Sequence, residues 1–141
     1  PDMPPLPTDR DDPLLAEARE KAQSSLGRFS ELYPQNQDRA LAKVRFVSNS
    51  GEVEYLWGEV RKIDGDMIDV FLVTPPVTHS GKLDRNMRAG LAEIEDWQVT
   101  EQDGKIHGGY TQRAMLRIAK ERWGKLPRKL QKVEKLYQDA G

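Results

Sequence analysis

His79 and His107 are the two histidines of the chain, and histidine is the side chain best suited to acid–base catalysis at neutral pH. His79 lies near Ser80 and Asp84 in a proline-containing segment, and His107 directly precedes two glycines. A catalytic pair, as in a small hydrolase, requires the two rings to meet in space, and nothing in their spacing demands this. Two separate turn or surface histidines are the simpler interpretation. Hydrolytic activity that survived both His→Ala changes would exclude the hydrolase.

Carboxylate clusters are the second type of candidate chemistry. Glu93 and Glu95 would share one face of a strand, about 7 Å apart, a distance at which two carboxylates can act as acid and base. The solvent face of an antiparallel strand explains them more simply. Asp64, Asp66 and Asp69 in DGDMID lack the later glutamate of a calcium loop, so this motif is more typical of a hairpin turn. With no cysteine and no HExxH motif, we expect neither a metal site nor a cofactor.

The stretch HGGYTQR, residues 107–113, places two glycines directly before a helical pattern. Backbone N–H groups at a helix N-terminus attract anions, so an anion site is one interpretation. The spacing matches neither GxxxxGK[ST] nor GxGxxG. Gly108 and Gly109 are more readily explained as the joint where a strand becomes a helix, because glycine permits positive φ and close packing. We expect Thr111 to be the N-cap of that helix.

Basic side chains dominate the C-terminal part of the chain, whereas the whole chain has a net charge of −1. Residues 112–137 contain nine bases and two acids. Such a segment can attract nucleic acid or another polyanion, although no known base-reading motif is present. A solvated helix face is the simpler interpretation. The candidate phosphate contacts are Arg113, Arg117, Lys120, Arg128 and Lys132.

Helical patterns lie at both ends of the sequence. Asp12 and Pro13 form a helix start, and apolar residues then recur at spacings of three and four up to Tyr33. This pattern predicts one helix of about 20 residues before a proline ends it. Two further helices are predicted near the C-terminus, over 111–124 and from 127 onward.

The middle of the chain alternates in the manner of β-strands. Strands are predicted over 40–48, 53–61, 67–73, 91–99 and 106–108. The turn signals SNSGE and DGD separate the first three, which favours an antiparallel meander with Val53, Tyr55 and Trp57 on one side of its second strand. Residues 74–90 read as a long loop. The sequence therefore predicts an α+β fold: an N-terminal helix, a curled antiparallel sheet of four to five strands and a C-terminal helix pair.

The length of 141 residues suits one domain, and 37% hydrophobic residues suffice for a core. Five prolines among the first thirteen residues predict an extended leader or linker over 1–12, followed by a domain over 13–123 and a helical extension over 124–141. The apolar runs are too short to cross a bilayer, and no signal segment opens the chain, which favours a cytoplasmic location.

Several short motifs occur along the chain in a specific order, at Glu54, Trp57, Pro75 or Pro76, Ile94, Asp96, Trp97, Gly108, Gly109, Tyr110 and Thr111. Together they resemble the bacterial YegJ-like domain of unknown function. The resemblance covers residues 13–118 and implies a small α+β domain without an established activity. Two features depart from the family pattern: the loop after the third strand reads Val-Thr-Pro-Pro in place of an Asn-x-Pro type, and the basic helical segment after residue 119 is additional.

These motif residues also have a physical interpretation. Asp96 is expected to hold a backbone N–H or a hydroxyl of Tyr110 or Thr111 and so lock the last strands to the glycine turn. The alternative is a ligand pocket lined by Trp57, Asp96, Trp97, His107, Gly108, Gly109, Tyr110 and Thr111. In the absence of a catalytic constellation, we expect a non-enzymatic protein-interaction or accessory module with an unknown protein partner. Binding of a polyanion through the basic helices is the alternative, and the oligomeric state is left open.

Overall fold

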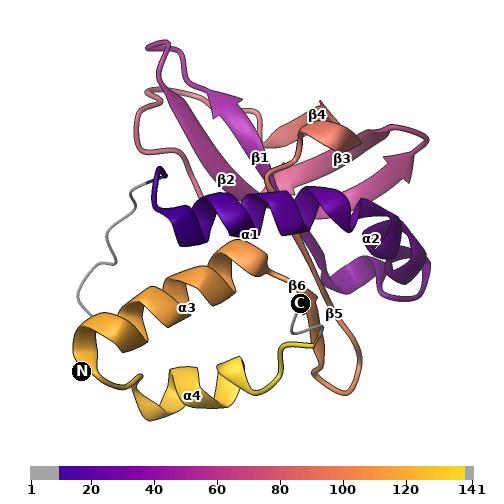
Figure 1. The fold of residues 1–141 in the computed structure, drawn as a ribbon. Coiled ribbons are helices and arrows are strands. Elements are labelled where there is room, and N and C mark those ends of the chain that lie inside the picture. Colours follow the sequence, from indigo (N-terminus) through magenta and orange to yellow (C-terminus); the bar gives the residue numbers. More distant parts are fainter. Residues whose placement is uncertain (1–9, 139–141) are drawn as a thin grey trace.

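The first helix begins where the sequence predicts, and the computed structural model describes the chain from residue 10 to residue 138 (Figure 1). Helix α1 spans Pro13–Ser24, and the Asp12 carboxylate caps it by accepting the N–H of Leu14 at 2.8 Å. The leader predicted over 1–12 falls mostly on residues 1–9, which lie outside the described part.

The single N-terminal helix that we predicted is divided in two. Ser25 leaves helical geometry (φ −113°, ψ 17°), so α1 ends there and α2 follows over Leu26–Leu32. The Ser25 hydroxyl donates to the C=O of Lys21 at 2.7 Å, while its oxygen accepts the indole N–H of Trp97 at 3.1 Å. The break therefore provides a bond to a strand residue far along the chain, which helical periodicity alone does not reveal.

Six strands form one antiparallel sheet in the order β4-β3-β2-β1-β5-β6. Their bounds are Ala40–Val47 (β1), Val53–Asp64 (β2), Met67–Leu72 (β3), Asn86–Gly90 (β4), Asp96–Thr100 (β5) and Ile106–Gly108 (β6). The expected α+β class and the β1–β2–β3 meander are confirmed, and the sheet has one strand more than the upper expectation. The turn at Asp64-Gly65 is the expected hairpin, with Gly65 at φ 62°.

The core lies on one face of the three-stranded meander. Alternation on β1, within the strand predicted over 40–48, buries Ala42, Val44 and Phe46, and the register places Leu56 of β2 opposite Val44. Val53, Tyr55 and Trp57 do share one side of β2, but it is the outer side. The buried side of β2 carries Leu56 and Val60, because register to β1 decides which of two alternating sets points inward.

The segment that we predicted as a loop over 74–90 contains the edge strand β4. Met87 and Ala89 pack against the core, and Met87 pairs with Val70 of β3. The strand predicted over 91–99 is also corrected, since Leu91–Glu93 form a 3-10 turn and β5 begins at Asp96. Glu93 and Glu95 therefore do not share the face of one strand.

The chain ends in the predicted helix pair, α3 over Tyr110–Trp123 and α4 over Arg128–Glu134 (Figure 1). Leu116, Ala119 and Leu126 form a small second core between them. The segment after α4 covers the β6 edge, where Ile106 N–H donates to Leu136 C=O at 2.9 Å. Within residues 10–138, no helix has both the length and the apolar character that a membrane span requires.

Candidate functional site at the joint between β5 and α3

A buried carboxylate closes the joint between the last strands and α3. Asp96 opens β5 and is fully buried. One of its oxygens accepts the N–H groups of Trp97 (2.8 Å) and Tyr110 (3.2 Å), and the other accepts the N–H (2.8 Å) and the hydroxyl (2.5 Å) of Thr111. These are the bonds expected from the sequence, and they tie β5 to the first turn of α3.

The N-cap prediction for Thr111 is wrong. Helix α3 begins at Tyr110, and Gly109 occupies the cap position with φ 64° and ψ 35°. Glycine has no side chain to accept the first free N–H groups of a helix. The Asp96 carboxylate accepts these N–H groups from the neighbouring strand. Thr111 therefore donates its N–H to the cap and is not itself the N-cap.

Burial raises the pKa of the Asp96 carboxyl above its ordinary value, because a charged group loses its hydration inside the protein. The hydrogen bonds from Thr111, Trp97 and Tyr110 act in the opposite direction by stabilising the carboxylate. Such a group is suited to holding structure through hydrogen bonds that strengthen at low dielectric.

The two glycines of the joint are required by close approach and by positive φ. Gly108 has φ 75°, and a Cβ added there would lie 2.3 Å from the C=O oxygen of Trp97 and 2.7 Å from its indole ring. The N–H of Gly109 donates to the same Trp97 oxygen at 2.6 Å. This geometry supports the interpretation of Gly108 and Gly109 as the joint where a strand becomes a helix.

Trp97 fills the space beneath the joint. It is fully buried, stacks on Phe29 with 5.2 Å between ring centroids, and meets Tyr110 edge-on at 6.1 Å. Its indole N–H donates to Ser25 Oγ and to the C=O of Ala22. An aromatic body with its polar tip satisfied is typical of a core residue.

The two histidines lie at opposite ends of β1. His107 pairs with Val99, which pairs with Ala40 at the start of β1. His79 accepts the N–H of Asn49, just beyond the end of β1, at 3.2 Å. Eight residues of strand separate the two places, a length of about 25 Å. His107 is instead paired with Glu101, whose carboxylate lies 2.7 Å from Nε2.

Seven of the eight residues proposed for a ligand pocket therefore meet at the joint, and Trp57 does not. It lies on the outer side of β2 opposite Lys43, and Lys43 in turn separates β2 from Asp96 on β5. Among the residues that the structure describes, no group of three or more His, Asp or Glu side chains is placed to hold a metal ion.

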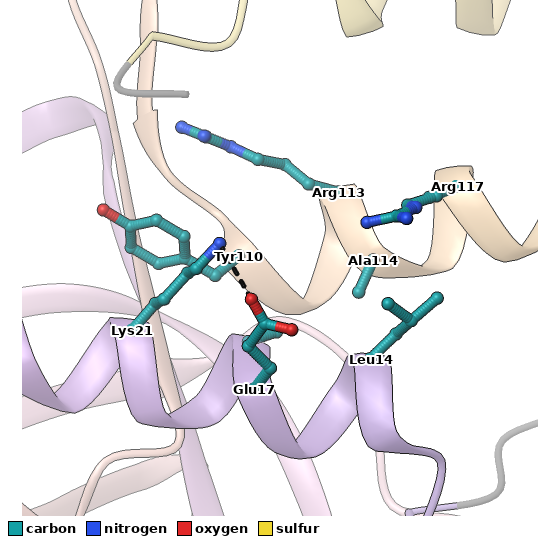
Figure 2. A pocket seen from close by; sticks show the side chains of 8 residues that line it. Leu14, Glu17, Lys21, Tyr110, Arg113, Ala114 and Arg117 are labelled. Atoms are coloured by element: carbon teal, nitrogen blue, oxygen red, sulfur yellow. Dashed lines mark ion pairs between the residues drawn. The ribbon is translucent and has the colours of Figure 1, made fainter. Parts of the chain in front are cut away.

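A small hollow lies beside the joint, between α1 and α3 (Figure 2). Its volume is about 120 Å³, enough for a few water molecules. Figure 2 shows Glu17 and Lys21 of α1, joined by an ion pair of 3.4 Å, facing Tyr110 and Arg117 of α3, whereas the Arg113 side chain points away from α1. The helix patterns do not distinguish these residues from an ordinary amphipathic face, so this hollow was not predictable from the sequence.

The candidate phosphate contacts are spread over several environments. The Arg113 guanidinium lies beside the rings of Tyr110 and Tyr137, 5.0 Å from each. Lys120 pairs with Glu134 at 2.9 Å, and Arg117 pairs with Glu121. Arg128 and Lys132 are exposed and have no acidic partner within residues 10–138.

A cluster of charges around Glu95 was missed at the level of sequence. Glu95 is buried and pairs with Arg10 and Arg19 from the region of α1 and with Lys43 from β1. The partners lie between 52 and 85 residues away, and no local spacing connects them. The local sequence shows only two adjacent acids, Glu95-Asp96, and their burial becomes evident in the structure.

Taken together, these features define a small α+β domain whose last strands are fastened to a helix by an internal carboxylate. The sequence profile of a family described as an uncharacterized protein conserved in bacteria (DUF2314) matches residues 12–123, and the chain belongs to this family. The match runs from the cap of α1 to the end of α3. Comparison with curated proteins and with solved structures gave no match. The narrower YegJ-like assignment stays a prediction.

Proposed function

We propose that the domain is a non-enzymatic protein-interaction or accessory module. The observation that carries this proposal is the outer face of β1, β2 and β3, where Val47 and Val53 lie directly opposite each other and are 50% and 42% exposed. Val73 is exposed beside Trp57, whose C=O accepts the Val73 N–H. Trp57 lies four residues along β2 from Val53 on the same face. Exposed apolar side chains that gather on one face of a sheet are typical of interaction sites.

The motif residues also support this proposal, because their polar groups are already bonded within the fold. The carboxylate of Asp96 is occupied by four donors, and His107 is occupied by Glu101. Groups bound in this way stabilise the fold and leave recognition to the surface. We further propose that residues 13–123 are the domain and 124–141 an extension, because the family match ends at Trp123.

Capture of a partner from the native host tests the interaction. The outer face predicts that Val53→Asp reduces recovery of a specific partner by about tenfold or more, because a charge must be buried at the apolar contact. Leu136→Asp is the matched control, since Leu136 is similarly exposed on the segment after α4. Absence of any partner at stringent salt, or equal loss with both variants, would contradict the proposal.

Binding of a polyanion is the second candidate, favoured by the basic surface at the end of α3 and on α4. Six exposed basic residues there have no acidic partner within residues 10–138: Arg122, Lys125, Arg128, Lys129, Lys132 and Lys135. A hollow of about 260 Å³ between the two helices is lined by the unpaired Lys125 and Lys135, and also by Lys120 with its ion-pair partner Glu134. Unpaired cations at this density attract phosphate groups.

Salt dependence distinguishes this candidate. We expect affinity for mixed duplex DNA or RNA to fall steeply as salt rises from about 50 mM, since each neutralised phosphate releases a counterion. The double variant Arg128→Glu, Lys132→Glu should weaken binding at low salt by about tenfold or more and flatten the slope. Arg61→Glu, Lys62→Glu on β2 is the control pair. A flat salt dependence of the wild type, or no binding at low salt, would exclude the candidate.

A further inference from the structure

The strand β1 has a free edge over its second half. β5 pairs with β1 only from Ala40 to Lys43, while β1 continues to Val47. The C=O of Lys43 accepts the N–H of Glu95 at 2.8 Å, so the peptide groups of Lys43 point toward β5. The N–H and C=O groups of Arg45 and Val47 point to the same side of β1 as those of Lys43, because the side to which peptide groups point repeats every second residue of a strand.

The residue directly after β1 confirms this assignment. Ser48 N–H donates to Glu52 C=O at 2.8 Å, so the even-numbered residues of this segment bond to β2. Within the described chain, no hydrogen bond joins the peptide groups of Arg45 or Val47 to another residue. Two residues of an inner strand thus present unpaired N–H and C=O groups, as the edge of a sheet does.

A hollow of about 410 Å³ adjoins this edge on the side of α1. Arg10, Arg19 and Arg45 line it together with Tyr55, and the Arg10 guanidinium stacks 3.6 Å above the Tyr55 ring. The acids that line it are Glu20, Glu93 and Glu95. Arg45 is exposed and has no acidic partner among residues 10–138.

The cations of this hollow are more accessible than its central acid. The Glu95 side chain is 5% exposed, whereas those of Arg10 and Arg19, which pair with it, are 46% and 24% exposed. Glu93 is turned toward Gly90, since a Cβ there would lie 2.5 Å from its carboxylate oxygen. Glu20 is exposed on the α1 side of the hollow, and Arg10 and Arg19 are already paired with Glu95. Arg45, at the strand edge itself, is the guanidinium of this hollow without an acidic partner among the described residues, and a carboxylate of a ligand is complementary to it.

A second hollow of about 280 Å³ adjoins the first and shares Arg45 and Glu93 with it. Its apolar lining is formed by Val44, Met67, Met87 and Ala89, with Arg88 at its border. Methionine side chains adapt to ligands of different shape. An acid-binding hollow and an apolar hollow thus lie side by side along one strand edge.

We propose that the free edge of β1 binds an extended peptide of a partner protein as an added strand, with acidic side chains toward Arg45 and apolar side chains toward Met67 and Met87. Strand addition uses the backbone for affinity and alternate side chains for specificity, and the two hollows fit that alternation. The inference rests on the proposed interaction function and specifies the chemistry of the partner.

A second copy of this chain is a poorer occupant. Two β1 edges that paired antiparallel around a twofold axis at Arg45 would place the two Arg45 side chains opposite each other. Like charges directly opposite across a strand pair are destabilising, whereas a glutamate of a peptide at that position is favoured.

The probe is the hexapeptide acetyl-Ser-Glu-Val-Glu-Val-Ser-amide, titrated into the full chain and followed by amide NMR shifts. We expect the Arg45 and Val47 amides to shift, and the peptide to bind about tenfold or more tightly than its Lys-for-Glu counterpart. Arg45→Glu should reverse this preference, while the exposed Arg61→Glu on β2 should leave it unchanged. Equal binding of both peptides, or shifts elsewhere only, would overturn the inference.

Val47→Pro isolates the backbone contribution. Proline removes the outward N–H without touching the bonds to β2, a position at which sheets tolerate it, so the variant should fold and lose peptide binding by about tenfold or more. The same shifts with inorganic phosphate, or dimerisation in sedimentation, would reassign the edge to a small anion or a second copy and overturn the proposal. Partner capture that fails with Val53→Asp but survives Arg45→Glu would sink this inference alone and leave the interaction function standing.

Discussion

Replacing Asp96 by alanine is expected to lower the free energy of unfolding by about 4 kcal/mol, as measured by urea denaturation. The substitution removes four hydrogen bonds at once and leaves the N–H groups of Trp97, Tyr110 and Thr111 without their acceptor in a buried joint. It also removes the negative charge at the start of α3, where the helix dipole favours one. Asp38→Ala is the control, because that carboxylate is exposed on the surface.

Asp96→Asn tests the charge state of the same group. Since burial raises its pKa in the folded state, the folded protein takes up this proton at higher pH than the unfolded chain, whose value is near 3.8. The stabilisation that comes from protonating Asp96 is therefore fully present below pH 3.8, and it is lost as the pH rises through the pKa of Asp96 in the folded protein.

The measured quantity is the difference in unfolding free energy between wild type and Asp96→Asn, followed upward from about pH 4 at fixed ionic strength. We expect the wild type to lose stability relative to the variant as pH rises, and Asp38→Asn to show no such trend. A wild type that gains stability relative to Asp96→Asn would mean that the four hydrogen bonds outweigh burial.

Short-range patterns predicted the parts of the fold that depend on local chemistry. The two-residue period predicted the strand over 40–48, in which Ala42, Val44 and Phe46 are buried, and Asp64-Gly65 predicted a hairpin, because both signals come from backbone geometry. A bond from Asp96 to Tyr110 or Thr111 was also expected, because these residues belong to the motifs that together resemble one family.

The remaining features depend on partners that are distant in sequence. Trp57 follows the same two-residue period as the buried residues, yet it points outward, because only the register to β1 sets the phase. The break at Ser25 is understood only with the indole of Trp97 in place, and the cap of α3 comes from Asp96 on another element. The cations around Glu95 were not predicted either, because they are also distant from it in the sequence.

The strand β4 escaped prediction for a different reason. Its sequence Asn86-Met-Arg-Ala-Gly90 has neither β-branched nor aromatic residues, so local propensity favours a loop. Pairing with β3 and packing of Met87 against the core override that propensity. This strand also lines the apolar hollow beside the free edge of β1, so the proposed peptide site could not be assembled from the sequence.

Gly108→Ala is expected to destabilise the fold by about 4 kcal/mol, through two separable effects. The first is positive φ, which costs an alanine about 1 kcal/mol wherever it occurs. The second is overlap with a rigid group, because the new Cβ would lie 2.3 Å from the C=O oxygen of Trp97. That oxygen is held by the N–H of Gly109, and the Trp97 ring is held between Phe29 and Tyr110, so neither can yield cheaply.

Gly81→Ala separates the two effects, because Gly81 has φ 82° and nothing within 4 Å of its added Cβ, whereas Gly108 has φ 75° and a backbone oxygen in the way. We expect Gly81→Ala to cost about 1 kcal/mol in urea denaturation, and Gly109→Ala to fall between the two. The Cβ at Gly109 meets the end of the Gln98 side chain, which can rotate away, and the ring of Tyr137. An equal loss of unfolding free energy for Gly81→Ala and Gly108→Ala would show that β5 can move away from the joint. That result would contradict the conclusion that Asp96 and Trp97 close the joint tightly.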